Sequence, residues 1–115
     1  MLTKLPKPIR TYFDATNQPD STAFLSAFAE DAVIKDEGKE HRGIQAIKDW
    51  SDGQQFAAQI TLEPTNVVQN GDNTIVTAKV DGNFDRTGLP DPVLLDFHFT
   101  VRNDKIVRLT ILLTE

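Results

Sequence analysis

The stretch VLLDFHFTVRNDKIVRLTILL (residues 93–113) decides the fold, because its hydrophobic residues recur at every second position. A period of two is typical of a β-strand that buries one of its faces. The apolar face of the first strand carries Val93, Leu95, Phe97, Phe99 and Val101. The pair Asn103-Asp104 favours a tight turn, after which one face of a second strand carries Val107, Leu109, Ile111 and Leu113. The stretch therefore predicts an antiparallel hairpin.

The same period extends back to about residue 58. Ile60 and Leu62 alternate with polar residues, and the segment NGDN (residues 70–73) is a strong turn signal. In the strand after this turn, the residues expected to face inward are Val76, Ala78, Val80 and Phe84. We therefore expect four long antiparallel strands after residue 58.

Before residue 58 the hydrophobic residues follow a helical period. We expect helices over residues 7–17, 21–29 and 43–54, and a short strand from Ala32 to about Asp36. Asp20 or Ser21 can cap the second helix. Because each strand has one apolar face that an amphipathic helix can cover, the sequence predicts a two-layer α+β fold in a single domain, residues 1–115.

Composition excludes several classes of function. The chain has 115 residues, no cysteine and a net charge of −5, so disulfides, thiolate metal sites and a basic nucleic-acid surface are not expected. His41 and His98 lie far apart in the sequence, and no Gly-rich phosphate motif is present. We therefore expect neither a metal nor a cofactor. The sequence has no apolar run long enough to span a bilayer and no stretch typical of a signal peptide. We therefore expect a cytoplasmic protein without a membrane partner.

The segment YFDATNQPDSTAFLSAFAEDAVIKDEGKEHRGIQAIKDW (residues 12–50) resembles the opening of the SnoaL-like, nuclear-transport-factor-2-like superfamily, and FTVRNDKIVRLTI (residues 99–111) resembles its final hairpin. The resemblance implies a cystatin-like cone: three N-terminal helices pack on a strongly bent antiparallel sheet. It further implies a pocket for a small organic ligand and a homodimer through the convex face of the sheet. The superfamily contains isomerases, cyclases, dehydratases, hydrolases and non-catalytic binders, so the fold alone does not assign a reaction.

The resemblance implies catalytic roles for Asp36 and Tyr12. Asp36 matches the general base of the ketosteroid-isomerase branch, a role that needs a carboxylate in a largely apolar pocket. Tyr12 matches the tyrosine that donates a hydrogen bond to the developing oxyanion in the same branch. The alternatives are that Asp36 is a solvated residue of a turn and that Tyr12 is a core tyrosine. Strand alternation places Asp36 on the same face as Ile34, which would turn its carboxylate toward the cavity.

Two further observations concern polar residues near the expected pocket. His41 is close to Asp36 in sequence and could form an acid–base pair with it, or it could be a loop residue at the rim. The second acidic oxyanion donor of the isomerases would fall on or next to Phe97, and its neighbours Asp96 and His98 alternate to the opposite face. The full ketosteroid-isomerase set of residues is therefore absent.

Aromatic residues are the other candidates for the ligand site. We expect the cone to be lined by Phe13, Phe28, Trp50, Phe97 and Phe99, which would either contact a ligand or fill the cone themselves. The first hypothesis is a pocket protein that catalyses proton transfer, isomerisation or hydrolysis of a small apolar molecule through Asp36 with Tyr12 or His41. The alternative is a non-enzymatic module that binds a ligand or forms a dimer. The face for that dimer would carry Leu94, Asp96, His98 and Thr100, with Leu112 beside them.

Overall fold

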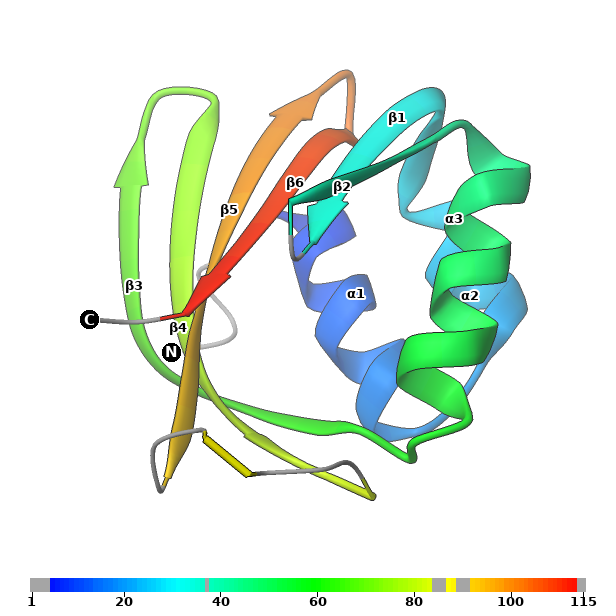
Figure 1. Ribbon diagram of the computed structural model, residues 1–115. Coiled ribbons are helices and arrows are strands. Elements are labelled where there is room, and N and C mark those ends of the chain that lie inside the picture. The colour runs from blue at the N-terminus through cyan, green and yellow to red at the C-terminus, as the bar shows by residue number, and fades with distance from the viewer. Residues whose placement is uncertain (1–4, 37, 84–86, 89–91, 114–115) are drawn as a thin grey trace.

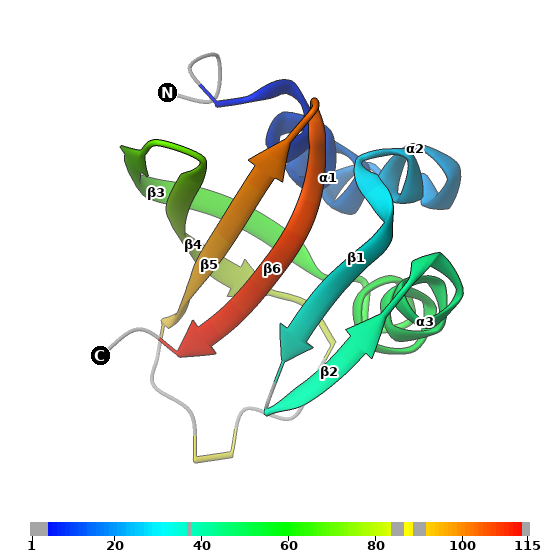
Figure 2. The same cartoon turned by 90° about the horizontal axis from the view of Figure 1, so that it is seen from above.

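A six-stranded sheet runs through the part of the chain that the computed structural model describes, which is residues 5–36, 38–83, 87–88 and 92–113. The strand order is β2-β1-β6-β5-β4-β3 (Figures 1 and 2). The strands are β1 (Phe28–Asp36), β2 (Lys39–Arg42), β3 (Thr61–Asn70), β4 (Asn73–Asp81), β5 (Val93–Arg102) and β6 (Lys105–Leu113). The four strands after residue 58 form the antiparallel meander that the sequence predicts.

The helices pack against one face of this sheet, which curves around them (Figure 1). They are α1 (Lys7–Asn17), α2 (Ser21–Ser26) and α3 (Ile44–Trp50), and α3 continues directly into the π-helix η2 (Ser51–Phe56). Asp20 caps α2 as expected, since its carboxylate accepts a hydrogen bond from the backbone N–H of Ala23. No helix in the described ranges is both long and apolar enough to cross a membrane.

Four expectations about the N-terminal half and its place in the sheet need correction. The second helix ends at Ser26, and Phe28 and Ala29 belong to a longer β1. The cause lies far along the chain: the N–H of Ile106 donates to the carbonyl of Ala27, and Phe28 pairs with Ile106. β1 and β6 run parallel, so the sheet is not antiparallel throughout.

The other two corrections concern the segment between β1 and β3. No strand was expected in the charged stretch after Asp36, but Lys39–Arg42 forms the short strand β2, which pairs with the end of β1. The third helix does not stay α-helical to residue 54, because its regular part ends at Trp50 and the chain continues in π-helical geometry. A π-helical turn adds a residue to the usual helical repeat and changes which side chains face inward.

The inward face of the meander largely agrees with the alternation in the sequence. Val76, Ala78, Val80, Val93, Phe97, Phe99, Leu109 and Ile111 are all buried. Two residues of β6 expected on this face depart from the pattern: Val107 is only partly buried, and Leu113 is 47% exposed. β6 has an extra residue opposite Thr100 and Val101 of β5, so Ile106 is fully buried while Val107 has no partner in the register. Phe84 lies outside the described residues.

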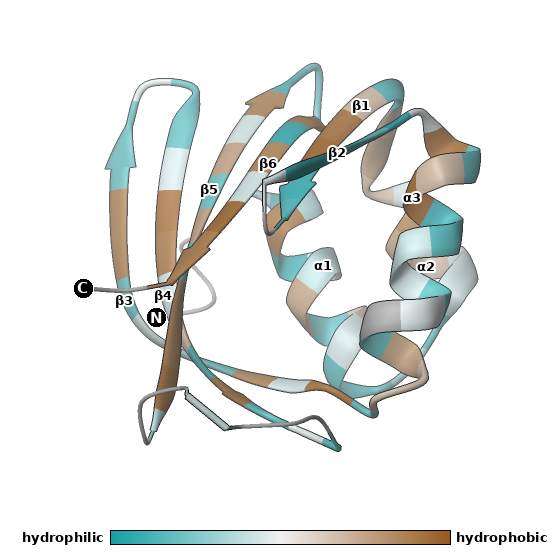
Figure 3. Ribbon diagram, in the orientation of Figure 1, coloured by the Kyte–Doolittle hydropathy of each residue, from teal (hydrophilic) through white to brown (hydrophobic). Residues whose placement is uncertain are grey.

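Aromatic rings fill part of the space between the helices and the sheet. Tyr12 is at their centre, with its ring centroid 5.1 to 6.1 Å from those of Phe13, Phe24, Phe28, Phe97 and Phe99. Most of these contacts are edge-to-face, an arrangement that the quadrupoles of the rings favour. Figure 3 shows that hydrophobic residues continue to the end of β6, beyond this cluster.

Gly82, at the end of β4, allows the chain to pass close to residues 58–60. Its φ is +148°, and a Cβ at this position would lie 2.9 Å from the carbonyl oxygen of Ala58. Gly53 has no atom within 4 Å of the equivalent position and no positive φ. Only Gly82 is therefore required by both backbone conformation and packing.

We predict that Gly82→Ala lowers the free energy of unfolding by about 2 kcal/mol, because it combines a strained φ with a backbone clash. The matched control Gly53→Ala should be neutral or slightly stabilising. Urea unfolding followed by circular dichroism measures both. Equal stability of the two variants would contradict the close approach at Gly82.

Candidate functional site

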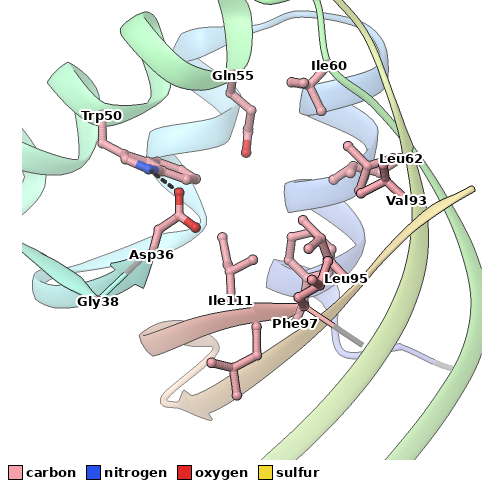
Figure 4. Close-up of a pocket in the computed structure, with 13 residues that line it drawn as sticks. Asp36, Gly38, Trp50, Gln55, Ile60, Leu62, Val93, Leu95, Phe97 and Ile111 are labelled. Atoms are coloured by element: carbon pink, nitrogen blue, oxygen red, sulfur yellow. Dashed lines mark hydrogen bonds between the residues drawn. The ribbon is translucent and has the colours of Figure 1, made fainter. Parts of the chain in front are cut away.

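A cavity of about 420 Å³ lies between the helices and the meander (Figure 4). Its walls are mainly hydrocarbon, and the apolar residues that line it are Trp50, Ile60, Leu62, Val80, Val93, Leu95, Phe97, Ile111, Leu112 and Leu113. Asp36, Gly38 and Gln55 complete the lining. Polar chemistry in this cavity therefore depends on very few groups.

Asp36 is the last residue of β1, and its carboxylate points into the cavity (Figure 4). Side chains along β1 alternate between the two faces of the sheet, which explains this direction. Ile34 is fully buried and Lys35 is exposed, so Asp36, at the end of the strand, lies on the same interior face as Ile34. Trp50, the last residue of α3, donates its Nε1–H to Oδ2 of Asp36 over 3.1 Å. This contact joins the sheet to the helical layer and orients the carboxylate.

Gln55 is the second polar side chain of the cavity, and only 5% of it is exposed. It comes from η2, and its amide is held by two residues of α1. The hydroxyl of Tyr12 donates to Oε1 of Gln55 over 3.0 Å, and Nε2 of Gln55 donates to the hydroxyl of Thr16 over 3.1 Å. Thr16 in turn donates to the backbone carbonyl of Tyr12 over 2.7 Å.

Tyr12 lies behind the cavity wall. It is fully buried and is not among the residues that line the cavity. Its one hydroxyl hydrogen is donated to Gln55, so in this arrangement it has none to donate to a ligand. Burial raises the pKa of Tyr12 well above its ordinary value, and the negative charge of Asp36 raises it further.

The other residues expected at the site are divided between the cavity and the core. Trp50 and Phe97 line the cavity, whereas Phe13, Phe28 and Phe99 are buried in the aromatic cluster and do not line it. His41 is in β2, opposite Ile34 in the strand register. Its ring centroid is 6.2 Å from that of Trp50, and His41 does not line the cavity either.

Sequence reasoning did not identify Gln55, because the third helix was expected to end before it. One signal was available: Ile44, Ile47 and Ser51 recur at helical spacing and form the expected inward stripe of that helix, and Gln55 is four residues after Ser51. Within the described ranges, no group of three or more His, Cys, Asp or Glu side chains is arranged to hold a metal ion. The cavity therefore offers one carboxylate and one amide in an otherwise mainly apolar lining.

Comparison with protein families matches residues 9–109 to the family described as the SnoaL-like domain. Among solved structures, a protein of Sinorhizobium meliloti provisionally assigned as a polyketide cyclase is 38% identical to this chain, with a TM-score of 0.88. The match covers 97% of this chain and 99% of that one. A comparison with curated proteins found no match.

Two more distant structures have a similar fold. One, from Xanthomonas campestris and also provisionally assigned as a polyketide cyclase, is 25% identical with a TM-score of 0.76, and the match covers 90% of this chain and 85% of that one. The other is a hypothetical protein of Catenulispora acidiphila with a ketosteroid isomerase-like fold, solved in complex with trimethylamine. It is 20% identical with a TM-score of 0.78, the match covers 95% of this chain and 86% of that one, and this likeness concerns the fold alone.

We predict that Tyr12 keeps its proton at a pH where an ordinary tyrosine has lost it. Since Tyr12 is the only tyrosine, the absorbance of tyrosinate reports this one group. In the unfolded chain it ionises at a pH of about 10, so the free energy of unfolding should fall as the pH rises above that value. The fall should be smaller in Tyr12→Phe, which has no hydroxyl to ionise. Ionisation at the ordinary pH in a chain that circular dichroism shows to be folded would contradict the buried hydrogen bond to Gln55.

Proposed function

Because the chain belongs to the SnoaL-like domain family, we propose that its cavity binds a small, mainly apolar organic molecule and that Asp36 exchanges a proton with it. One observation supports this most strongly: Asp36 is the one charged side chain among the described residues that line an otherwise apolar cavity. A carboxylate that a ligand desolvates is a better proton acceptor than one in water. The hydrogen bond from Trp50 keeps it facing the ligand.

The family and the S. meliloti relative support binding of a small molecule or an isomerase or cyclase role. Both reactions move protons between atoms of one substrate, and a single positioned carboxylate can accept a proton and later return it. The proposal assigns no catalytic part to His41, which lies outside the cavity, or to Tyr12, whose hydroxyl hydrogen is engaged by Gln55. Within the cavity, Trp50 serves as a positioning residue for Asp36.

The second candidate is a ligand-binding module without catalytic activity. It is favoured by the aromatic cluster, which fills part of the interior, and by the absence of the Tyr12 hydroxyl from the cavity wall. The two candidates share the binding step and differ only in whether Asp36 takes a proton from the bound molecule. A reaction that needs only a base and a cavity therefore distinguishes them.

We predict that the wild-type protein accelerates the ring opening of 5-nitrobenzisoxazole relative to acetate. In this reaction a base removes the one C–H proton of the isoxazole ring, the N–O bond breaks, and a coloured cyanophenolate forms. The product's charge is spread over its nitroaromatic ring, so the probe does not require an oxyanion donor. Asp36→Asn should lower kcat/KM by about a hundredfold, because general-base catalysis contributes roughly that factor.

The control is Asp31→Asn, which makes the same chemical change at an exposed position of β1 and should keep the wild-type rate. The single tryptophan, Trp50, lines the cavity, and its fluorescence reports binding of the probe independently of turnover. Binding without acceleration would support the ligand-binding module. An Asp36→Asn variant with an undiminished rate would refute the acid–base role.

We further propose a homodimer through the outer face of β5 and β6. Leu94, Asp96, His98 and Thr100 are half-buried there. Leu112, opposite Asp96 in the register, is 52% exposed and also borders the cavity. The hydroxyl of Thr77 donates to Asp96 over 2.6 Å, so the carboxylate already has a partner within the chain. A face whose carboxylate is already paired and that exposes a leucine is suited to an isologous contact with a second copy.

We predict that light scattering at micromolar concentration gives the mass of two chains, and that Leu94→Glu gives the mass of one. The glutamate would place a charge in the centre of the contact, where it costs desolvation free energy without gaining a partner. Circular dichroism checks that the variant is folded. A monomeric wild-type protein would contradict the dimer and leave the cavity proposal unaffected.

A further inference from the structure

The molecule that occupies the cavity, we infer, carries a hydrogen-bond donor, such as a hydroxyl or an N–H group, which it presents to Asp36 and Gln55. This inference rests on the proposed function, because it names the chemical class of the ligand that the same cavity binds. It comes from the arrangement of donors and acceptors on the cavity wall. Gln55, which the sequence analysis missed, then becomes a binding residue.

The hydrogen-bond network of α1 fixes the orientation of the Gln55 amide. Thr16 has a single hydroxyl hydrogen, which it donates to the backbone carbonyl of Tyr12. Toward Gln55, the oxygen of Thr16 can therefore only accept, and the atom facing it must be Nε2. If the amide were reversed, two oxygens would face each other without a hydrogen between them. The amide oxygen of Gln55 is thus fixed toward Tyr12 and the cavity.

An amide oxygen has two lone pairs, and Tyr12 occupies one of them. In Figure 4 this oxygen points into the same part of the cavity as the carboxylate of Asp36. The two groups come from opposite layers, since Gln55 belongs to η2 and Asp36 to the end of β1. Together they present acceptor atoms from two sides of one space.

Among the described side chains that line the cavity, the one hydrogen with no assigned acceptor is the second hydrogen on Nε2 of Gln55, the amide atom that faces Thr16. The single N–H of the Trp50 indole is donated to Asp36, and the hydroxyl of Tyr12 is donated to Gln55. The remaining side chains that line the cavity are hydrocarbon. A ligand that presents only acceptors to these groups, such as a ketone or an ether, would place its oxygen against the amide oxygen of Gln55 and the negative charge of Asp36, which opposes binding. A ligand with an O–H or N–H group can donate to either acceptor, and the isoxazole probe can turn its acidic C–H toward the carboxylate.

A matched pair of ligands tests this directly. 2-Naphthol and 2-methoxynaphthalene have the same ring system and differ in whether the oxygen carries a hydrogen. Binding is followed by calorimetry and by the NMR signal of the Trp50 indole N–H, which is the only indole in the chain. We expect 2-naphthol to bind at least about tenfold more tightly, since a hydrogen bond to a charged acceptor contributes at least that factor.

Variants of Gln55 separate its contribution from that of Asp36. Gln55→Met removes the amide oxygen and should reduce the preference for 2-naphthol, whereas Gln55→Glu retains an acceptor and should preserve it. Gln45→Met makes the same change at an exposed position of α3 and should leave the preference at its wild-type value. If Gln55→Met does not fold, the comparison of the two ligands on the wild-type protein still decides the matter.

The outcomes distinguish the inference from the function on which it rests. Equal affinity for the two ligands, or tighter binding of the ether, would overturn the inference and leave binding in the cavity intact. If neither ligand shifts the Trp50 signal or releases heat, both the inference and the proposed binding function fail. Tighter binding of 2-naphthol that is lost in Gln55→Met supports both.

Discussion

The buried hydrogen bonds of Gln55 are the constraint on which the rest of the site depends. A primary amide that is 95% covered by protein must find partners, because an unsatisfied one costs about 1–3 kcal/mol. Gln55 finds them in Tyr12 and Thr16, which are one turn apart on α1. The bonds therefore tie η2 to α1 across the interior. They also explain why the hydroxyl of Tyr12, at the centre of the aromatic cluster, is donated to Gln55 and does not line the cavity.

Asp36 and Trp50 provide the corresponding link between the sheet and α3. The carboxylate arrives from the end of β1 and the indole from the end of α3, and their hydrogen bond crosses the edge of the cavity. Because the aromatic cluster fills part of the interior, the space that remains is bounded by these polar groups and by the hydrocarbon side chains of the meander. The site is thus the space that remains between the Tyr12–Gln55 and Trp50–Asp36 hydrogen bonds. Because Tyr12 and Trp50 donate their hydrogens in these bonds, the groups that face the cavity are mainly acceptors.

Strand alternation and helical periodicity predicted the meander, the two-layer arrangement and the inward direction of Asp36, since each depends on residues close together in the sequence. Phe28 was placed in a helix because the N-terminal sequence does not show that β6 pairs with it. The sequence left open whether Tyr12 faces the cavity or the core, because the partner of its hydroxyl, Gln55, lies 43 positions away. Gln55 was missed because the inward stripe was followed only to the expected end of the third helix, before the π-helical segment that carries it. Short-range patterns thus found the elements and one carboxylate, and long-range contacts decided the polar network.

The decisive measurement is a crystal structure of the protein with 2-naphthol, because it locates both the ligand and its oxygen. We expect the rings among Leu62, Phe97 and Ile111, with the oxygen at hydrogen-bond distance from Asp36 or Gln55. An empty cavity at a saturating concentration of the ligand, or a ligand whose oxygen faces the hydrocarbon wall at Ile60 and Val80, would contradict it.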